Sequence, residues 1–312
     1  MFRMQRSTRI LLALLAVALG LFVWLLRTNF SGDAPAKPVT MTQLRALASA
    51  MPGAAPERIE LELVAHGRFP GDFLAAGTGL SPKVFGVFAY RLTGKGMAPV
   101  MIDAGLTEAV SDDLRMSKFH AEQQGRVDTA LRDAGLILFT HEHVDHMGGL
   151  IAALRRNPQQ SEALLSRVQF NRGQLPGGPL SSKLDWPLRI SASAHITDGA
   201  PQAVAPGIVA IPAPSHTPGS QMFYVRLTDG REWLFTGDIA TLQVNWLELR
   251  GQSKFLQYYR PEDRDEVFAW LRTIRKLKAQ APGLNVVAGH DYAAMFDRKQ
   301  KQIIPFGFKH PG

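Results

Sequence analysis

The chain has 312 residues, 46% of them hydrophobic, so it can bury a core in one large domain or two small ones. Its formal charge is +8, but four of the positive charges are arginines within the first 30 residues, which leaves +4 for the rest. That modest excess contains no run of five like charges and gives no reason to expect a nucleic-acid partner. The absence of cysteine excludes disulfides and thiolate metal ligands.

The first 30 residues differ in composition from the remainder. Arg3, Arg6 and Arg9 precede Ile10–Leu26, a stretch of 17 residues without a charged or polar side chain. This length is at the lower edge for a transmembrane helix and slightly above that of a signal-peptide core. Positive charge before the stretch predicts a cytoplasmic amino terminus, with the rest of the chain exported to the periplasmic side.

The best cleavage candidate, Ala34-Pro35-Ala36, lies well past the apolar stretch. We therefore predict that residues 1–30 are an uncleaved signal anchor, with a secreted, cleaved protein as the alternative. A buried core helix is the third interpretation. Residues 31–56 are predicted to be a linker with one helix over 41–51, capped by Thr40 or Thr42. Residues 57–312 are predicted to form a single domain.

Alternation and composition predict the elements in the first half of this domain. Strands are expected over 59–66, 84–92, 99–103 and 136–139, loops around 69–73 and 77–79, and helices near 108–119 and 126–134. The strand at 99–103 ends in Asp103, and a turn glycine, Gly105, follows.

The strand over 136–139 leads into the sequence Thr-His-Glu-His-Val-Asp-His at 140–146, and Gly148-Gly149 predicts a turn before a helix that reaches Arg156. In an extended chain, residues two apart point to the same side, so His141 and His143 can bind one metal ion. Asp145 and His146 follow the bend and can bind a second. Imidazole together with a carboxylate suits zinc. The zinc-protease pattern is excluded, because Asp145 stands where its second histidine belongs.

The second half repeats the order of strand followed by polar turn. We expect strands over 207–213, 221–227, 231–235 and 285–288, a hairpin turn at 228–230, and a helix over 261–280 that Pro261 begins. Between the halves, residues 157–195 mix loops and short elements, with a break at 176–179, and are predicted to overhang a site.

His216, Asp238 and His290 directly follow three of these predicted strands, as the central motif follows its own. If the carboxyl ends of the strands lie together, all these side chains converge on one cleft. They would then provide enough ligands for two metal ions with an open position for water.

In combination and order, these motifs resemble the metallo-β-lactamase superfamily. The matching segments are Asp103-Ala104-Gly105, His141–His146, Ser215–Gly219, Gly237-Asp238 and Gly289-His290, within about residues 59–300. The resemblance implies an α/β fold, an αββα sandwich of two mixed β-sheets with outer helices, here preceded by an N-terminal membrane-anchor helix.

The resemblance also implies a ligand set. His141, His143 and His216 would hold the first zinc, Asp145, His146 and His290 the second, and Asp238 would bridge the two. Asp103 would support the metal-bearing loops. His66, His120, His195 and His310 match no motif and are interpreted as ordinary residues.

The implied activity is that of a metal-dependent hydrolase with two Zn²⁺ per chain, iron or manganese being alternatives, that acts on a small-molecule substrate. A hydroxide between ions about 3.5 to 4 Å apart would attack an ester, lactone, thioester or phosphoester, and Asp145 would orient it. Three alternatives stay open. A β-lactamase is disfavoured because true metallo-β-lactamases have no bridging carboxylate at the position of Asp238. The others are an iron-dependent sulfur dioxygenase and a non-catalytic, metal-stabilised binding protein.

Aromatic side chains are the candidates for the substrate pocket. They are Phe69, Phe73, Trp186, Trp246, Tyr258, Tyr259 and Tyr292.

Overall fold

The computed structural model describes residues 5–29, 32–176, 184–187, 192–296 and 304–309. The first five-stranded sheet contains β1 (Arg58–Pro70), β2 (Pro82–Thr93), β3 (Val100–Ile102), β4 (Lys118–Phe119) and β5 (Leu136–Leu138), in the order β4-β1-β2-β3-β5. The second contains β8 (Gln202–Ala205), β9 (Ile208–Pro212), β10 (Gln221–Arg226), β11 (Glu232–Phe235) and β12 (Asn285–Val287), in the order β12-β11-β10-β9-β8. Both sheets are mixed, because β3–β5 and β11–β12 are parallel pairs and the other pairs are antiparallel.

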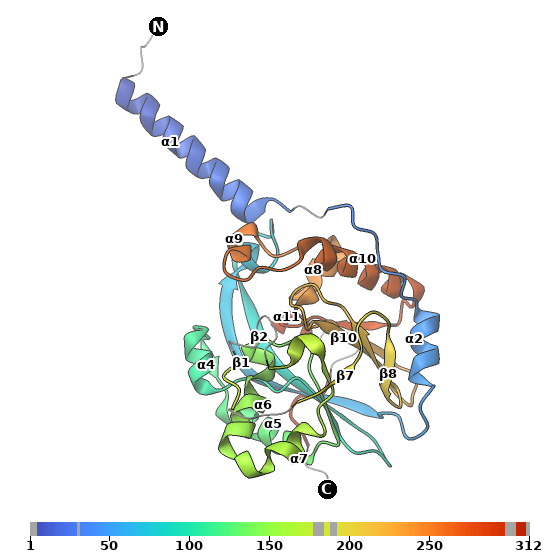
Figure 1. Cartoon of the computed structure of the whole chain (residues 1–312). Helices are drawn as coiled ribbons and strands as arrows, with labels where there is room; N and C mark the ends of the chain where they lie inside the picture. The colour runs from blue at the N-terminus through green and yellow to red at the C-terminus, as the bar shows by residue number, and fades with distance from the viewer. Residues whose placement is uncertain (1–4, 30–31, 177–183, 188–191, 297–303, 310–312) are drawn as a thin grey trace.

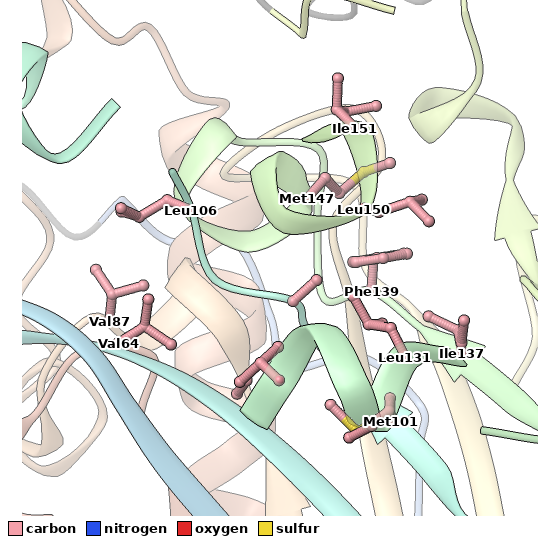
Figure 2. Packing of buried hydrophobic residues seen from close by; sticks show 14 of the residues in the cluster. Val64, Val87, Met101, Leu106, Leu131, Ile137, Phe139, Met147, Leu150 and Ile151 are labelled. Carbon is pink, nitrogen blue, oxygen red and sulfur yellow. The ribbon is translucent and has the colours of Figure 1, made fainter. Parts of the chain in front are cut away.

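Three hydrophobic clusters define the layers. One lies between the two sheets and joins side chains such as Leu61 and Ile102 to Phe223 and Phe235. The second covers the outer face of the first sheet, under α5 (Ala121–Asp133) and α6 (Val144–Arg156). Figure 2 shows this packing, with Leu131 of α5 and Leu150 of α6 among the labelled side chains.

The third cluster covers the outer face of the second sheet. Here α10 (Arg264–Gln280) contributes Phe268, Leu271 and Ile274, which pack with Tyr224 of β10. Helices therefore lie outside two facing mixed sheets, and the predicted αββα sandwich is confirmed (Figure 1).

The segment predicted as a linker is packed against this domain. Its helix, α2 (Met41–Ala48), begins after Thr40, whose hydroxyl accepts a hydrogen bond from the Gln43 amide at 3.2 Å. Met41 and Leu44 of α2 are buried in the cluster on the second sheet. The division of the chain at residues 30 and 56 stays a prediction. The described part of residues 31–56 packs on the outer face of the second sheet.

The apolar amino-terminal stretch forms α1 (Arg6–Phe22), and a π-helical turn continues it over Val23–Arg27. Its mean hydropathy reaches 2.5 over a window in which no residue is buried, and Figure 1 shows the helix projecting from the body. It is a candidate membrane span by length and composition, criteria that a signal sequence also meets.

Several predicted boundaries are wrong. β1 runs on to Pro70 and is followed by a short helix, α3 (Gly71–Leu74), where a loop was expected. The helix expected over 108–119 ends at Asp113 in α4 (Glu108–Asp113), and Lys118–Phe119 is strand β4, which pairs with β1. α10 begins at Arg264 and not at Pro261, because the Asp263 side chain accepts a hydrogen bond from the Glu266 amide and caps it.

The central double glycine is also not a turn. Gly148 and Gly149 lie inside α6, which begins at Val144. A Cβ at Gly149 would collide with the carbonyl of Ala104, and one at Gly148 would lie 3.3 Å from the Leu106 Cα. The glycines therefore let the helix approach the backbone that follows β3.

The remaining described elements are short. They are α7 (Ser161–Leu165), α8 (Gln243–Glu248), α9 (Lys254–Gln257), α11 (Tyr292–Phe296), β6 (Phe170–Asn171), β7 (Ala194–Ile196) and 3₁₀ turns over Pro158–Gln160, Arg172–Gln174 and Gly237–Ala240. Residues 177–179 of the predicted break lie outside the described residues.

Candidate metal centre

The central motif, residues 140–146, lies in the loop after β5 and the first turn of α6. His141 lies in the loop and His143 occupies the N-cap position of α6. Asp145 and His146 are in the first helical turn, where the partial positive charge of the helix N-terminus favours a carboxylate. All except the half-buried His143 are buried.

The second sheet supplies the other three side chains from the carboxyl ends of its strands. His216 lies in the loop after β9, Asp238 in the 3₁₀ turn after β11, and His290 after β12. The structure brings all seven side chains into two adjacent groups, one of His141, His143, His216 and Asp238 and one of Asp145, His146 and His290.

The first group surrounds the Nδ1 atom of His143. This atom is 2.9 Å from His141 Nε2 and 3.3 Å from His216 Nε2. Asp238 Oδ2 lies 3.9 Å from His141 Nε2 and 3.6 Å from His216 Nε2. Three imidazole nitrogens and one carboxylate oxygen thus face a common point.

The second group is built around two facing imidazoles. His146 Nε2 and His290 Nε2 are 3.1 Å apart, and Asp145 Oδ2 is 3.6 Å from His290 Nε2. The other oxygen of Asp238, Oδ1, lies 2.8 Å from His290 Nε2. Because the two oxygens of Asp238 face different groups, this carboxylate has the position that a bridging ligand requires.

Outer partners fix the orientation of three of the rings. His146 Nδ1 is 2.9 Å from Asp103 Oδ2, and His216 Nδ1 is 3.1 Å from Glu262 Oε2. His290 Nδ1 donates to the carbonyl of Gly86 at 2.7 Å. Each contact leaves Nε2 directed inward, which is how metal-binding histidines are usually held.

Asp103 holds the central loop through the contacts expected of a supporting residue. Its carboxylate accepts hydrogen bonds from the Thr140 amide at 2.8 Å and the Thr140 hydroxyl at 2.9 Å, besides contacting His146. Its φ of 60° lies in the left-handed region, which aspartate tolerates better than most residues. The buried hydrogen bonds compensate for that strained backbone.

A second set of supporting residues was not predicted from the sequence. Glu142, which points away from the donors, accepts hydrogen bonds from the Thr217 hydroxyl at 2.7 Å and the Gly219 amide at 3.0 Å. Asn171 and Gln174 both donate to the Gly219 carbonyl at 2.9 Å. The described part of segment 157–195 thus supports the loop that carries His216, and no local sequence pattern predicts these contacts.

Burial and neighbouring charges shift the pKa values of the cluster, in directions that differ from one side chain to another. Burial, followed by the nearby His216, lowers the pKa of His143 to about 3. For His146, burial is outweighed by the Asp103 and Asp145 carboxylates, which raise its pKa to about 10. Burial would raise the pKa of Asp145, yet the His146 and His290 imidazoles hold it below its ordinary value.

The donor set fits metal ions. Buried imidazole nitrogens that face one another at hydrogen-bond distance need a proton or a cation between them, and bound metal displaces such protons. Asp238 Oδ1 is buried and, although His290 Nε2 lies 2.8 Å away, no well-aligned donor among the residues that the structure describes gives it a hydrogen bond. The chemistry of nitrogen and carboxylate donors, with no sulfur, suits zinc, iron or manganese.

An apolar cavity of about 130 Å³ adjoins the second group. Its lining is Phe69, Phe73, Leu74, Phe85, Leu114, Met116, Leu256, Asp145 and Arg260. Phe85 also stacks on His290, with ring centroids 3.7 Å apart. The cavity therefore connects apolar side chains directly to the buried donors.

The other aromatic candidates lie elsewhere. Trp246 is buried under α10, Trp186 packs against the α6 cluster, and Tyr258 and Tyr259 are exposed. Tyr292 packs against Phe296 with tilted rings, their centroids 4.4 Å apart, and does not line the cavity. Only Phe69 and Phe73 of the seven candidates line it.

The histidines outside the motifs stand apart from the described donor groups. His66 Nδ1 and His120 Nε2 are 3.0 Å apart, and His195 is exposed on β7. His310 lies outside the described residues.

Comparisons with known proteins agree with this geometry. Residues 82–290 match the family described as "Metallo-beta-lactamase superfamily". No curated protein matches the chain. The chain belongs to the metallo-beta-lactamase superfamily, whose hydrolases its fold and donor clusters resemble.

Solved structures with the same fold include a quorum-quenching N-acyl homoserine lactone lactonase, 14% identical, with a TM-score of 0.60 over 82% of this chain and 99% of that one. An N-acyl homoserine lactone hydrolase with the product N-hexanoyl-L-homoserine at its catalytic metal centre is 15% identical, with a TM-score of 0.59 over 80% and 98%. A variant of AiiA from B. thuringiensis with N-decanoyl-L-homoserine bound is 14% identical, with a TM-score of 0.58 over 80% and 98%. At these identities the likeness concerns the fold.

Proposed function

We propose that the chain is a zinc-dependent hydrolase with two ions per chain that cleaves a carboxylic ester, lactone or thioester carrying an apolar acyl group. The observation that carries this proposal is the continuity between seven histidine and aspartate donors and the apolar cavity at Asp145. A phosphoester is favoured by several cationic side chains around its oxygens, whereas among the described residues Arg260 is the one cationic side chain that lines this cavity.

His141, His143 and His216 would hold one ion, Asp145, His146 and His290 the other, and Asp238 would bridge them. When bound, the ions supply a nucleophile at neutral pH and polarise the substrate carbonyl. Asp145 lies between the donors and the cavity, so its carboxylate would orient the attacking water through a hydrogen bond.

Arg260 would bind the oxygens of the substrate or of the carboxylate product. Arg260 lines the same cavity as Asp145, which places its side chain beside the donor groups. Among the described residues, no side chain forms an ion pair with Arg260, so its hydrogen-bond donors can face a ligand. The apolar lining would meanwhile exclude water from the acyl group.

We also propose that residues 1–30 anchor the protein in a membrane with the domain of residues 57–312 on the periplasmic side. The support is the exposed apolar helix and the positive charge that precedes it.

The test uses the full zinc-loaded chain and a panel of acyl esters, N-acyl lactones, thioesters, phosphodiesters and β-lactams. We expect cleavage of the acyl substrates, loss of activity in His143→Ala, and unchanged activity in the matched control His195→Ala. Equal rates in His143→Ala and the wild type, or cleavage of phosphodiesters alone, would contradict the proposal. Elemental analysis separates a dizinc enzyme from a one-iron dioxygenase.

A further inference from the structure

The carboxyl end of the apolar helix is held against the domain at a defined place. The π-helical turn over Val23–Arg27 contacts α3 and α9. Lys254 Nζ of α9 lies 4.6 Å from the centre of the Trp24 ring, and Arg27 Nε lies 3.7 Å from Oδ2 of the buried Asp72 in α3. These contacts fix which face of the domain is turned toward the helix.

Asn29 adds two hydrogen bonds to the same docking site. Its side-chain amide donates to the Leu249 carbonyl at 2.7 Å, and its carbonyl oxygen accepts from the Gly251 amide at 3.0 Å. Gly251 in turn accepts a hydrogen bond from the Ala76 amide, in the segment that follows α3. Polar contacts of this kind orient two elements that a flexible tether would leave free.

The elements that receive the helix are also walls of the apolar cavity. α3 contributes Phe73 and Leu74, and α9 contributes Leu256. The two elements touch each other through Phe73 and Phe255, whose ring centroids are 5.3 Å apart. The cavity at Asp145 therefore shares two wall elements with the docking site of the helix, and Figure 1 shows one of them, α9, beside the base of α1.

Exposed apolar side chains surround this point. Tyr258 and Tyr259, directly after α9, are 70% and 66% exposed, and Leu80 is 51% exposed. Leu80 belongs to the loop that begins at Gly77, where an added Cβ would lie 3.2 Å from the Arg27 carbonyl. Tyrosine and tryptophan are enriched where proteins meet the membrane–water interface, because their rings are apolar and their edges polar.

We propose that α9, Leu80, Tyr258 and Tyr259 form an interfacial surface that rests on the bilayer around the anchor, so that the cavity receives the acyl part of its substrate from the membrane. The contact with the bilayer rests on the proposed anchoring, and the route of the substrate rests on the proposed hydrolase function. The occupant of this surface is lipid, since the anchor docked beside it would hold it at the bilayer.

The first experiment measures depth in the membrane without any need for turnover. Because the chain has no cysteine, Leu80→Cys and Tyr259→Cys can each carry a single nitroxide in the full chain, reconstituted in vesicles of phosphatidylethanolamine and phosphatidylglycerol. The control is Asp133→Cys at the exposed end of α5, which lies away from α9 in Figure 1.

We expect the labels at 80 and 259 to be accessible to oxygen and shielded from a water-soluble nickel chelate, while the label at 133 shows the reverse. Equal access of the nickel chelate to all three labels would overturn the interfacial surface.

The second experiment tests the route of the substrate. In the full chain, Tyr258→Ser/Tyr259→Ser is expected to lower kcat/KM about ten-fold for a long-chain ester embedded in the vesicles, which corresponds to about 1.4 kcal/mol. Its kcat/KM for a short, water-soluble ester should not change, and Tyr258→Trp/Tyr259→Trp should retain the wild-type values.

An equal loss on both substrates would overturn the proposed route. If the nitroxide depths are as expected but the wild type cleaves no acyl substrate, the hydrolase proposal fails and the interfacial surface stands.

Discussion

The contact between Glu262 and His216 allows a sharp test of the candidate metal centre. Glu262 Oε2 lies 3.1 Å from His216 Nδ1, and its other oxygen accepts a hydrogen bond from the Gln257 side chain at 3.0 Å. The Glu262 side chain is 1% exposed, so it would act on the metal through His216 and not through solvent. It is a positioning residue and does not reach the donor groups itself.

Removal of such an outer partner typically costs about ten- to hundred-fold in metal affinity. Glu262→Ala removes both acceptor oxygens, so its loss of zinc affinity should lie at the upper end of this range, about hundred-fold, which is equivalent to about 2.8 kcal/mol. Glu262→Gln keeps one acceptor and the shape of the side chain but loses the charge, so about ten-fold is expected. Hydrolysis should recover in both variants when zinc is in excess.

The assay is competition for zinc with a chromogenic chelator, with circular dichroism to check the fold. Glu266→Gln is the matched control, because Glu266 lies four positions away, is 36% exposed and pairs with Lys37 at 2.6 Å. If Glu262→Ala binds zinc within two-fold of Glu266→Gln, the assignment of His216 as an oriented ligand is refuted.

Three further predictions concern stability and are measured by urea denaturation. Gly149→Ala should lower the unfolding free energy by about 1 to 3 kcal/mol, because its Cβ would overlap the Ala104 carbonyl. Gly125→Ala should raise it by about 0.5 to 1 kcal/mol, because the added Cβ there meets no neighbouring atom within 4 Å. Equal effects of the two substitutions would contradict the packing argument. The hydrogen bond with Arg45 lowers the pKa of Glu232, so the stability that this contact contributes above pH 4.5 should be lost as the pH falls below that value. The unfolding free energy should fall less steeply with decreasing pH in Glu232→Gln. Thr40→Ala removes the N-cap of α2 and should cost about 1 kcal/mol, and no change would contradict the capping role.

The architecture and the convergence of the donors could be predicted because both depend on local patterns. Apolar runs such as 136–139 and 208–212 form strands in both sheets, and the polar residues that follow them meet because strand ends meet. The order of motifs then matched a known fold. The assignment of the seven side chains as metal ligands stays a prediction.

Features that depend on tertiary contact could not be predicted. The Gly148-Gly149 pair suggested a turn, yet it permits a helix to lie against the backbone at Ala104. Glu262 contacts His216 from 46 residues away, and Gln174 contacts Gly219 from 45. No spacing rule marks such pairs.

The arrangement of the donors across the sandwich has a consequence for a chain without disulfides. His146 belongs to the first half and His290 to the second, 144 residues apart, and Asp238 adjoins both. Ions shared among them would act as a cross-link between the halves, and closing a loop of about 100 residues covalently is worth about 4.7 kcal/mol in the chain-entropy model. If the proposed zinc ions are the ones bound, zinc supply would therefore govern how long each molecule survives proteolysis as well as how fast it turns over.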